Sequence, residues 1–344
     1  MPDLADRTLE LVDIASESRH EAAIFQYVMD AVDGRDAGDT CLLAGVTERR
    51  DRPLVLLAGH LDTVPAQDNR PGRRDATRVH GVGACDMKAG LAVMIELCLN
   101  PPADATVDLG FVFFGREELP FGEMALTPLL AREPGLREAD LAIVLEPTAN
   151  ELHAGCLGNI NATWSFQGKS GHSARPWLAD NAIHRAAAGI GAVAALAPEE
   201  KRFGDLAFKE VVSVVTVEGG IARNVIPAHA TAQVNMRYAP GTDAGDAEAR
   251  LHAICDPHGA LAIDANAPSG PVAQSALVDR LVAAGNLAVA PKQAWTPVAE
   301  FGLVGVDAVN FGPGNPALAH QQDEYVEIAA LERCDEILRA FLCA

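Results

Sequence analysis

Residues 54–65 read LVLLAGHLDTVP, an apolar run that stops at a glycine and is followed by a histidine and an aspartate. A near-continuous apolar run is typical of a parallel strand that is buried on both faces. His60 and Asp62 stand two residues apart, so in an extended chain their side chains point the same way. Asp62 can then accept the second ring N–H of His60, as carboxylates do behind metal-binding histidines. The alternative interpretation is an ordinary polar pair at a strand end.

The segments that follow this run alternate between strand and helix patterns. Further apolar strands are expected at 106–115 and 140–146 and helices at 86–100 and 121–133, after a helical region at 6–34. Strands that alternate with helices build a mostly parallel sheet with helices on both faces. The chain therefore belongs to the α/β class.

The pattern changes after about residue 157, where polar and apolar residues alternate as in strands with one solvated face. Such strands are expected at 160–170, 211–220, 230–240 and 260–266, and amphipathic helices at 178–196 and 243–258. The α/β pattern then returns, with a helix at 275–286, a strand at 306–312 and a final helix from about 326. We therefore expect one α/β domain made of residues 1–157 and 268–344, with an α+β domain inserted at 158–267.

Composition excludes several classes of protein. The 344 residues carry a formal charge of −20, and an acidic surface repels phosphate backbones, which argues against a nucleic-acid partner. No apolar run reaches the roughly 18 residues of a membrane span, and the first residues do not resemble a secretory signal. The seven cysteines are scattered without a CxxC pair, which indicates a reducing, cytoplasmic environment.

Polar residues also stand at the ends of the other expected strands. Asp86 opens a helix after GVGAC, Glu117 and Glu118 follow a strand in GREELP, Glu146 ends a strand, and His320 follows the GPGNP loop. Ligands of open α/β sheets gather at the carboxyl ends of the strands. These residues form either a carboxylate and histidine metal site or a set of solvated strand ends with one helix cap. Two ligand sets that share an aspartate would make a two-metal site.

Seven segments in order resemble the motifs of the M20 metallopeptidases: GHLDTVP (59–65), GVGACDMKAG (81–90), GREEL (115–119), LEPT (145–148), GHSARPWLADNAIH (171–184), RNVIP (223–227) and HQQDE (320–324). The similarity runs from about residue 9 to residue 344 and is greatest to the succinyl-diaminopimelate desuccinylases, in their shorter actinobacterial form. It implies a zinc-exopeptidase-like α/β/α catalytic domain and a ferredoxin-like inserted domain that serves as lid and dimerisation surface.

The resemblance also implies a ligand set for two zinc ions. His60 and Glu146 would hold one ion, Glu118 and His320 the other, and Asp86 would bridge them. In the family, the aspartate that matches Asp86 is followed by a cis peptide bond. Cobalt or manganese would suit the same donors.

Catalytic roles follow from the same resemblance. Glu117 would be the general base that takes a proton from water and delivers it to the leaving amine, and Asp62 would orient His60. Two metal ions would activate the water and polarise the amide carbonyl. His172 would stabilise the oxyanion, reaching in from the partner subunit of a homodimer. An ordinary turn histidine is the alternative for His172.

Substrate contacts are expected at positions that match those of family desuccinylases. An arginine suits bidentate recognition of a carboxylate, although an arginine on a strand surface needs no such role. Backbone N–H groups in the GPGNP loop can cradle a carboxylate as well. The expected residues are Asn224, Arg237, Thr296, Gly312, Gly314 and Asn315.

Two positions depart from the family pattern. Pro297 stands where related desuccinylases have an aspartate, and Glu300 stands where actinobacterial relatives have an arginine.

Three hypotheses for the function follow from the sequence. The first is a dizinc amidohydrolase that cleaves N-succinyl-LL-2,6-diaminopimelate in lysine biosynthesis. The second is another M20 enzyme of small N-acyl amino acids or peptides: an N-acetylornithine deacetylase, an aminoacylase or a dipeptidase. The third is a non-catalytic binding protein on the same scaffold.

Overall fold

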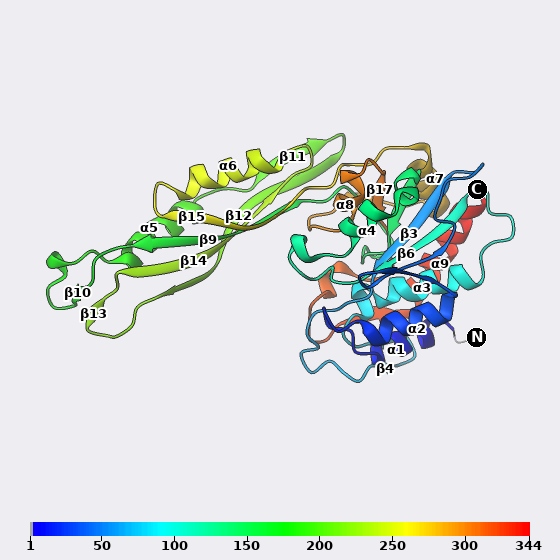
Figure 1. The fold of residues 1–344 in the computed structure, drawn as a ribbon, viewed down its shortest axis with the longest axis horizontal. Coiled ribbons are helices and arrows are strands. Elements are labelled where there is room, and N and C mark those ends of the chain that lie inside the picture. The colour runs from blue at the N-terminus through cyan, green and yellow to red at the C-terminus, as the bar shows by residue number, and fades with distance from the viewer. Residues whose placement is uncertain (1–2) are drawn as a thin grey trace. The chain divides into compact units, whose positions relative to one another are not determined.

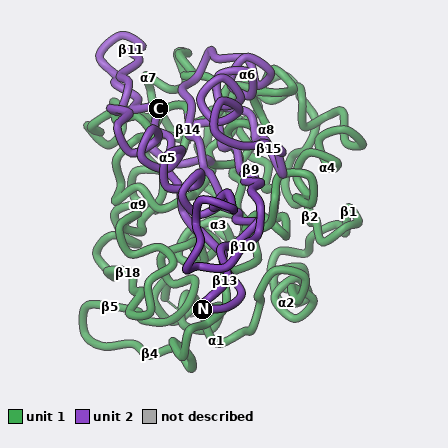
Figure 2. Tube along the Cα trace, turned by 90° about the vertical axis from the view of Figure 1, so that its left-hand side faces the viewer, with its two compact units in different colours: residues 1–155, 270–292, 296–344 green, residues 156–269, 293–295 purple. Residues whose placement is uncertain are grey.

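The computed structural model describes residues 3–344, which form two compact units (Figure 2). Unit 1 contains the chain up to Gly155, Gly270–Lys292 and Thr296–Ala344, and unit 2 contains Cys156–Ser269 and Gln293–Trp295. These divisions fall two residues from the expected ones at 157 and 268. The return of residues 293–295 to unit 2 was not expected.

The core of unit 1 is an eight-stranded sheet with the order β1-β2-β6-β3-β7-β17-β8-β16. Its strands are β1 (Arg35–Gly38), β2 (Cys41–Gly45), β3 (Leu54–His60), β6 (Asp108–Phe114), β7 (Leu141–Val144), β8 (Leu152–Ala154), β16 (Val289–Pro291) and β17 (Ala308–Asn310). The central strands β6, β3, β7 and β17 run parallel, and every residue of β3 is buried. The expected α/β class is thus confirmed, while the antiparallel hairpin β1–β2 at the edge was missed.

Helices pack on the sheet of unit 1 and against one another. They are α1 (Leu4–Asp13), α2 (Ala22–Val32), α3 (Ala89–Leu99), α4 (Leu126–Arg132), α7 (Ala276–Gly285), α8 (Val298–Leu303) and α9 (Ile328–Cys343). Helix α3 is buried nearly all round because it packs on β3 and is covered by α1, α2 and α9, while α8 packs on β7 and β17 beside α4 (Figure 1). No helix among residues 3–344 has the length and apolarity needed to cross a lipid bilayer.

Two helix expectations need correction, and one helix was missed. The helix expected at 86–100 begins at residue 89, because a π-helical turn (Ala84–Lys88) with non-helical angles at Asp86 precedes it. The helix expected at 121–133 is divided into a 3-10 turn at Phe121–Glu123 and α4. Helix α8 was missed because its six residues are too few to show a helical period.

A small antiparallel sheet in unit 1 joins segments that are far apart in the sequence. Its order is β18-β5-β4, formed by β18 (Tyr325–Glu327), β5 (Arg78–His80) and β4 (Arg73–Arg74). Tyr325 pairs with His80. The chain just after His320 is therefore fixed beside the chain that leads to Asp86.

Unit 2 has the strand–helix–strand–strand–helix–strand order of a ferredoxin-like fold. The elements are β9 (Gly158–Gln167), α5 (Ala182–Ala194), β12 (Leu206–Gly219), β14 (His229–Tyr238), α6 (Ala244–Cys255) and β15 (Ala260–Ala267). The antiparallel sheet has the order β11-β12-β14-β9-β15, where β11 (Glu199–Phe203) is an added edge strand. Its core includes Trp164, Phe166 and Tyr238 under the two helices. Strand β11 was missed because its sequence, EEKRF, is charged and mostly exposed.

Candidate metal centre

The parallel register of the central sheet brings strand ends together. Ala58 of β3 pairs with Val144 of β7, so two residues further on Glu146 lies level with His60. Glu146 Oε1 is 3.7 Å from His60 Nε2. Two of the polar strand ends singled out in the sequence are therefore neighbours in space.

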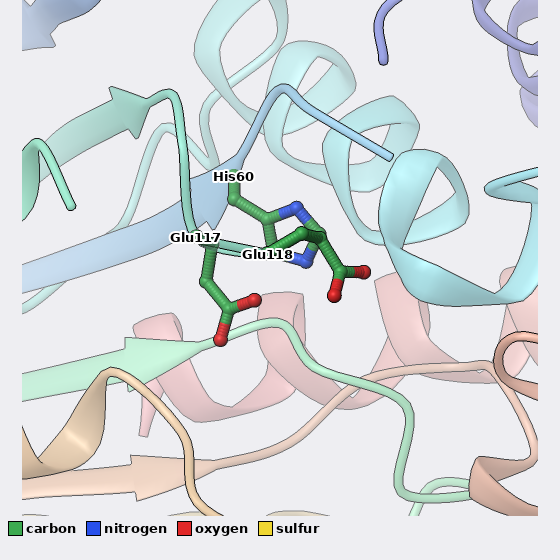
Figure 3. A group of neighbouring side chains, drawn as sticks. All are labelled: His60, Glu117 and Glu118. Atoms are coloured by element: carbon green, nitrogen blue, oxygen red, sulfur yellow. The ribbon is translucent and has the colours of Figure 1, made fainter. Parts of the chain in front are cut away.

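On the other side of β3, the end of β6 supplies two more carboxylates. His60 pairs with Phe114, and the chain then turns and presents Glu117 and Glu118 (Figure 3). His60, Glu117 and Glu118 each place one ligand-type atom within 4.8 Å of the others. Parallel strands that end on the same side of the sheet, at their carboxyl ends, thus gather a histidine and two carboxylates.

The ring of His60 is oriented by its neighbour Asp62. His60 Nδ1 lies 3.0 Å from the backbone carbonyl oxygen of Asp62 and 3.6 Å from its carboxylate oxygen Oδ1. A carbonyl oxygen only accepts, so Nδ1 carries the proton and donates it. The other ring nitrogen, Nε2, lies 3.1 Å from Asp86 Oδ1, on the side of the carboxylate cluster. The expectation that the Asp62 carboxylate is the acceptor is corrected, because the nearer acceptor is the backbone.

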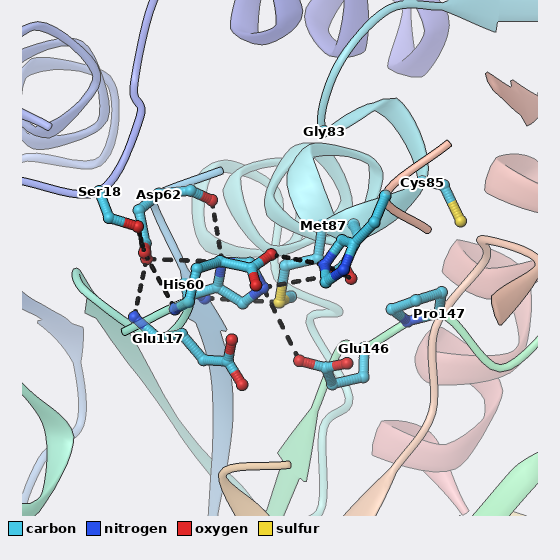
Figure 4. A network of polar contacts seen from close by, with 12 residues as sticks. Ser18, His60, Asp62, Gly83, Cys85, Met87, Glu117, Glu146 and Pro147 are labelled. Atoms are coloured by element: carbon cyan, nitrogen blue, oxygen red, sulfur yellow. Dashed lines mark hydrogen bonds and ion pairs between the residues drawn. The ribbon is translucent and has the colours of Figure 1, made fainter. Parts of the chain in front are cut away.

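The carboxylate of Asp62 instead holds the loop after β6. It accepts the backbone N–H groups of Glu117 at 3.0 Å and Glu118 at 3.1 Å and the hydroxyl of Ser18 at 2.7 Å (Figure 4). Asp62 is fully buried. Asp62, two residues after His60, therefore positions the backbone of both glutamates at the neighbouring strand end.

Asp86 and His320 complete the cluster. Asp86 sits in the π-helical turn before α3, and its peptide bond to Met87 is cis, as the resemblance implied. His320 Nε2 lies 2.9 Å from Glu118 Oε1 and 3.6 Å from Asp86 Oδ2. The hydrogen bond to Glu118 raises the pKa of His320 to about 9. Asp86 thus directs one oxygen towards each histidine.

Two overlapping donor groups share Asp86. His60, Asp86 and Glu146 form one group, and Asp86, Glu118 and His320 form the other, with ligand-type atoms within 4.8 Å inside each group. Histidine nitrogen with carboxylate oxygen is a donor set that zinc and similar divalent ions prefer. All five expected metal ligands are brought together.

The electrostatics of the cluster also fit bound cations. Desolvation by the surrounding protein and the nearby Asp86 carboxylate raise the pKa of Glu146 to about 7. Desolvation also raises the pKa of Glu117 well above its usual range, with Glu146 and Glu118 adding to the effect. Lys292 Nζ lies 3.5 Å from Glu146 Oε2. The single positive charge of Lys292 does not balance the negative charges of the carboxylates in the cluster. Bound divalent ions would offset the negative charge that is left.

The expected substrate residues of unit 1 have varied surroundings. Thr296 is buried just before α8. The N–H of Gly312 donates to Thr148 Oγ1 at 3.0 Å, so the expectation that it cradles a carboxylate is wrong. A Cβ atom on Gly312 would lie 2.4 Å from the Glu146 carbonyl oxygen, so this glycine permits close packing behind Glu146. Asn315 is exposed, and its Oδ1 accepts the N–H of Ala317.

Gly314 also serves close packing. A Cβ atom at this position would lie 2.6 Å from Cys85 Sγ. Its carbonyl oxygen accepts the N–H of Ala149 at 2.7 Å. The GPGNP loop is therefore pressed against the turn that carries Asp86.

The remaining expected residues belong to unit 2. His172 is exposed, and its Nδ1 accepts the N–H of Ala174 at 3.0 Å, so in the neutral ring Nε2 carries the proton. Asn224 accepts the N–H of Ser173 through its backbone oxygen. Arg237 donates from Nε to Asn235 Oδ1, and burial lowers its pKa. No ion-pair partner of Arg237 is found among residues 3–344.

The two departures from the family pattern lie at α8. Pro297 precedes the first residue of the helix. Glu300 is 1% exposed, and its Oε1 accepts the backbone N–H and the hydroxyl of Thr127 at 2.8 and 2.7 Å. Burial raises the pKa of Glu300 to about 7. Glu300 therefore ties α8 to α4.

Sequence reasoning missed three residues of this region. Ser18 and Lys292 give no local signal, because their partners lie far away in the chain. Glu324 accepts three backbone N–H groups beside Asp86. It stands in the HQQDE motif, but the motif does not tell which of its acidic residues turns inward.

Comparison with known proteins agrees with this geometry. A model of the peptidase family M20/M25/M40 matches residues 56–344. The chain belongs to this family. A relative from Mycobacterium tuberculosis, named after succinyl-diaminopimelate desuccinylase (DapE), is 37% identical over 99% of this chain and 98% of its own length. The succinyl-diaminopimelate desuccinylase of Corynebacterium glutamicum is 33% identical over 97% of this chain and 95% of its own length.

Solved structures of the M20 fold superpose on the chain. Aminopeptidase PepT from Bacillus cereus has a TM-score of 0.77 at 18% identity and covers 98% of this chain and 97% of its own. The metallo-carboxypeptidase Sso-CP2 of Sulfolobus solfataricus has a TM-score of 0.76 at 16% identity, with coverages of 100% and 99%. At this identity the likeness shows the fold, which is that of the M20 family. As a member of this family with desuccinylase relatives, the chain is a hydrolase of amide bonds.

Proposed function

We propose that this protein is a dizinc amidohydrolase that cleaves N-succinyl-LL-2,6-diaminopimelate into succinate and LL-2,6-diaminopimelate. The observation that carries the proposal is the pair of donor groups that share Asp86, with Glu117 held beside them. The desuccinylase names of two relatives that match the chain over nearly its whole length support the choice of substrate.

In this proposal, His60 and Glu146 would hold one zinc ion, Glu118 and His320 would hold the other, and Asp86 would be shared by both. Such ions would supply Lewis-acid polarisation of the amide carbonyl and activation of a water molecule. His60 suits its part because Nδ1 donates to a backbone carbonyl and leaves Nε2 free to bind. Asp86 suits its part because its two oxygens face different histidines.

Glu117 acts as the general base. It takes one proton from the attacking water and delivers it to the amine nitrogen as the C–N bond breaks. The water oxygen becomes part of the succinate carboxylate, and the amine leaves as free diaminopimelate. The backbone N–H of Glu117 donates to the Asp62 carboxylate, which holds Glu117 in place. The carboxylate of Glu117 therefore stays beside the metal donors, although the proposal does not use it as a ligand.

Recognition of the substrate is assigned to polar side chains by the chemistry of each. His172 has an outward Nε2–H that suits an oxyanion. The guanidinium of Arg237 suits a substrate carboxylate, because a partly buried arginine without an ion pair gains most from one. Asn224, Thr296 and Asn315 are further polar contacts, whereas Gly314 contributes by packing.

A homodimer in the cytoplasm is part of the proposal. Strand β11 pairs only with residues 206–210 of β12, so one edge of β12 is open from Val211 onward in the described residues. Val215 and Val217 are 60% and 56% exposed on this strand. An open edge with exposed valines suits pairing with the same strand of a second copy.

The test of the proposed reaction compares two substrates. The zinc-loaded protein is assayed on N-succinyl-LL-2,6-diaminopimelate and on N-acetyl-L-ornithine, and we expect kcat/KM to favour the succinyl compound by about a hundredfold or more. Turnover of the acetyl compound alone would support the proposed hydrolysis but would contradict the proposed succinyl substrate. Inertness of the zinc-loaded protein towards both compounds and a panel of N-acyl amino acids would favour a binding protein.

A further inference from the structure

The carboxylate of Glu324 is buried beside the metal donors without being one of them. Glu324 is 1% exposed. Its Oε2 accepts the N–H of Gly83 at 3.0 Å, and its Oε1 accepts the N–H groups of Cys85 at 2.7 Å and Asp86 at 2.9 Å. One side chain therefore satisfies three backbone donors of the turn that presents Asp86.

The same residue ties together two distant segments. Glu324 lies four residues after His320, and its hydrogen bond to Asp86 spans 238 residues of sequence. Its backbone oxygen also accepts the N–H of Gly81 at 3.1 Å. The next residue, Tyr325, begins the β18–β5 ladder. The contacts of Glu324 thus extend that ladder up to the shared donor Asp86.

The contacts fix the position of Asp86 more than they build the fold. The ladder between β5 and β18 already joins the two segments through backbone hydrogen bonds. What Glu324 adds is an acceptor for the N–H of Asp86 itself and of the residues just before it. The Asp86 carboxylate in turn lies 3.1 Å from His60 and 3.6 Å from His320. A shift of this turn would change both donor groups together.

We propose that Glu324 is a positioning residue of the metal centre, which holds Asp86 where it can bind both ions. The inference rests on the proposed function, because it assumes that Asp86 is the shared ligand. Loss of Glu324 would leave three N–H groups without their acceptor, two of them in buried hydrogen bonds, and buried groups are costly to leave unpaired. The turn would then relax towards other acceptors and carry Asp86 with it.

Two substitutions grade the effect. Glu324→Ala removes all three hydrogen bonds, and we expect it to weaken zinc binding by roughly 10- to 100-fold, the usual cost of removing a group that orients a ligand. Glu324→Gln keeps the shape and one acceptor oxygen, so Cys85 and Asp86 keep a partner while an amide N–H₂ faces Gly83. Its loss should be smaller than that of the alanine variant.

The experiment measures zinc binding directly. Metal-free full-length protein is titrated with zinc in competition with a chromophoric chelator, below the unfolding temperature of every variant. Glu327→Gln is the matched control, because Glu327 lies on β18 with an exposed side chain that faces Arg78, and zinc binding should not change. Thermal unfolding of the metal-free variants separates a loss of stability from a loss of metal affinity.

The outcomes separate this inference from the proposed function. Two zinc ions bound by the wild type and weaker binding by both Glu324 variants support it. Unchanged zinc affinity in Glu324→Ala, even with a lower unfolding temperature, would overturn the inference and leave the dizinc enzyme intact. If the alanine variant does not fold, Glu324→Gln alone decides by the same criterion. Failure of the wild type to bind zinc would overturn the proposed function itself.

Discussion

The carboxylate of Asp62 accepts the backbone N–H of Glu117 at 3.0 Å. The end of β3, which carries His60, is thereby connected to the loop that presents Glu117, the proposed general base. His60 itself is oriented by the backbone carbonyl of Asp62 rather than mainly by the carboxylate. The side chain and the backbone of one residue thus have separate tasks.

Asp62→Asn tests this division. The amide loses one of the two acceptor oxygens, while the backbone carbonyl still holds His60, so we expect kcat/KM to fall by roughly 10- to 100-fold with zinc content retained. Steady-state kinetics and metal analysis of the purified variant measure the two effects. Ser18→Ala, which removes only the hydroxyl donor to Asp62, should cost less. A loss of zinc in Asp62→Asn would show that the carboxylate also holds a metal donor in place, either His60 or Glu118.

Glu117→Gln separates the base from the ligands. We expect kcat to fall by about 10²- to 10⁴-fold, the usual contribution of a general base, while two zinc ions remain bound. Glu118→Gln is the matched comparison, because it should lose zinc as well as activity. Metal analysis and kinetics on the same preparations are the measurement. The assignment fails if Glu117→Gln is the variant that loses zinc.

Glu300 predicts a pH dependence of stability. Burial raises its pKa to about 7 in the folded protein. The folded state then keeps a proton that the unfolded chain releases, so the free energy of unfolding falls as pH rises from about 4.5 to 7. The full loss is about 3 kcal/mol, from 1.36 kcal/mol for each pKa unit. Glu300→Gln stays neutral and should lack this loss.

Denaturant unfolding at pH 5 and pH 8 measures the effect. The stability of Glu300→Gln relative to wild type should be more favourable at pH 8 than at pH 5. Glu332→Gln, a substitution at an exposed position on α9, serves as control. Its difference in unfolding free energy from the wild type should be the same at pH 5 and pH 8. If the difference in unfolding free energy between Glu300→Gln and the wild type is the same at both pH values, Glu300 is already accommodated as an anion.

Arg237→Lys tests recognition of a substrate carboxylate. Lysine keeps the charge but lacks the planar pair of donors, so we expect KM to rise by about tenfold or more with a smaller effect on kcat. Arg202→Lys on β11, where the arginine is exposed and paired with Glu200, is the matched control and should behave as wild type. A change confined to kcat would remove Arg237 from substrate binding.

Much of the centre was predictable because strand ends obey a simple rule. The apolar run to Gly59 predicts a buried parallel strand, and residues that follow such strands meet at the carboxyl end of the sheet. His60, Glu118 and Glu146 come together in this way. The expectation that Asp86 bridges two ions came from the family resemblance, because an aspartate at a helix start is equally typical of a helix cap.

The parts that were missed depend on contacts that a local pattern does not encode. Glu324 and Lys292 have partners more than 100 residues away, and sequence spacing carries no information on such distances. Gly312 was misread because a glycine-rich loop suggests free N–H groups, whereas Thr148 already uses this one. Strands β1 and β11 are short and largely exposed, so they exist through pairing rather than through a hydrophobic period.

The order of the donors along the chain has a consequence for biosynthesis. A ribosome makes His60, Asp86, Glu118 and Glu146 before it makes unit 2, and it makes His320 only after unit 2. Domains fold as they emerge, with the N-terminal parts first. The second donor group, and the Glu324 contacts that hold Asp86, therefore cannot form until unit 2 has been made. In the proposed dizinc enzyme, loading of the second metal would for this reason be a late event in the life of the molecule.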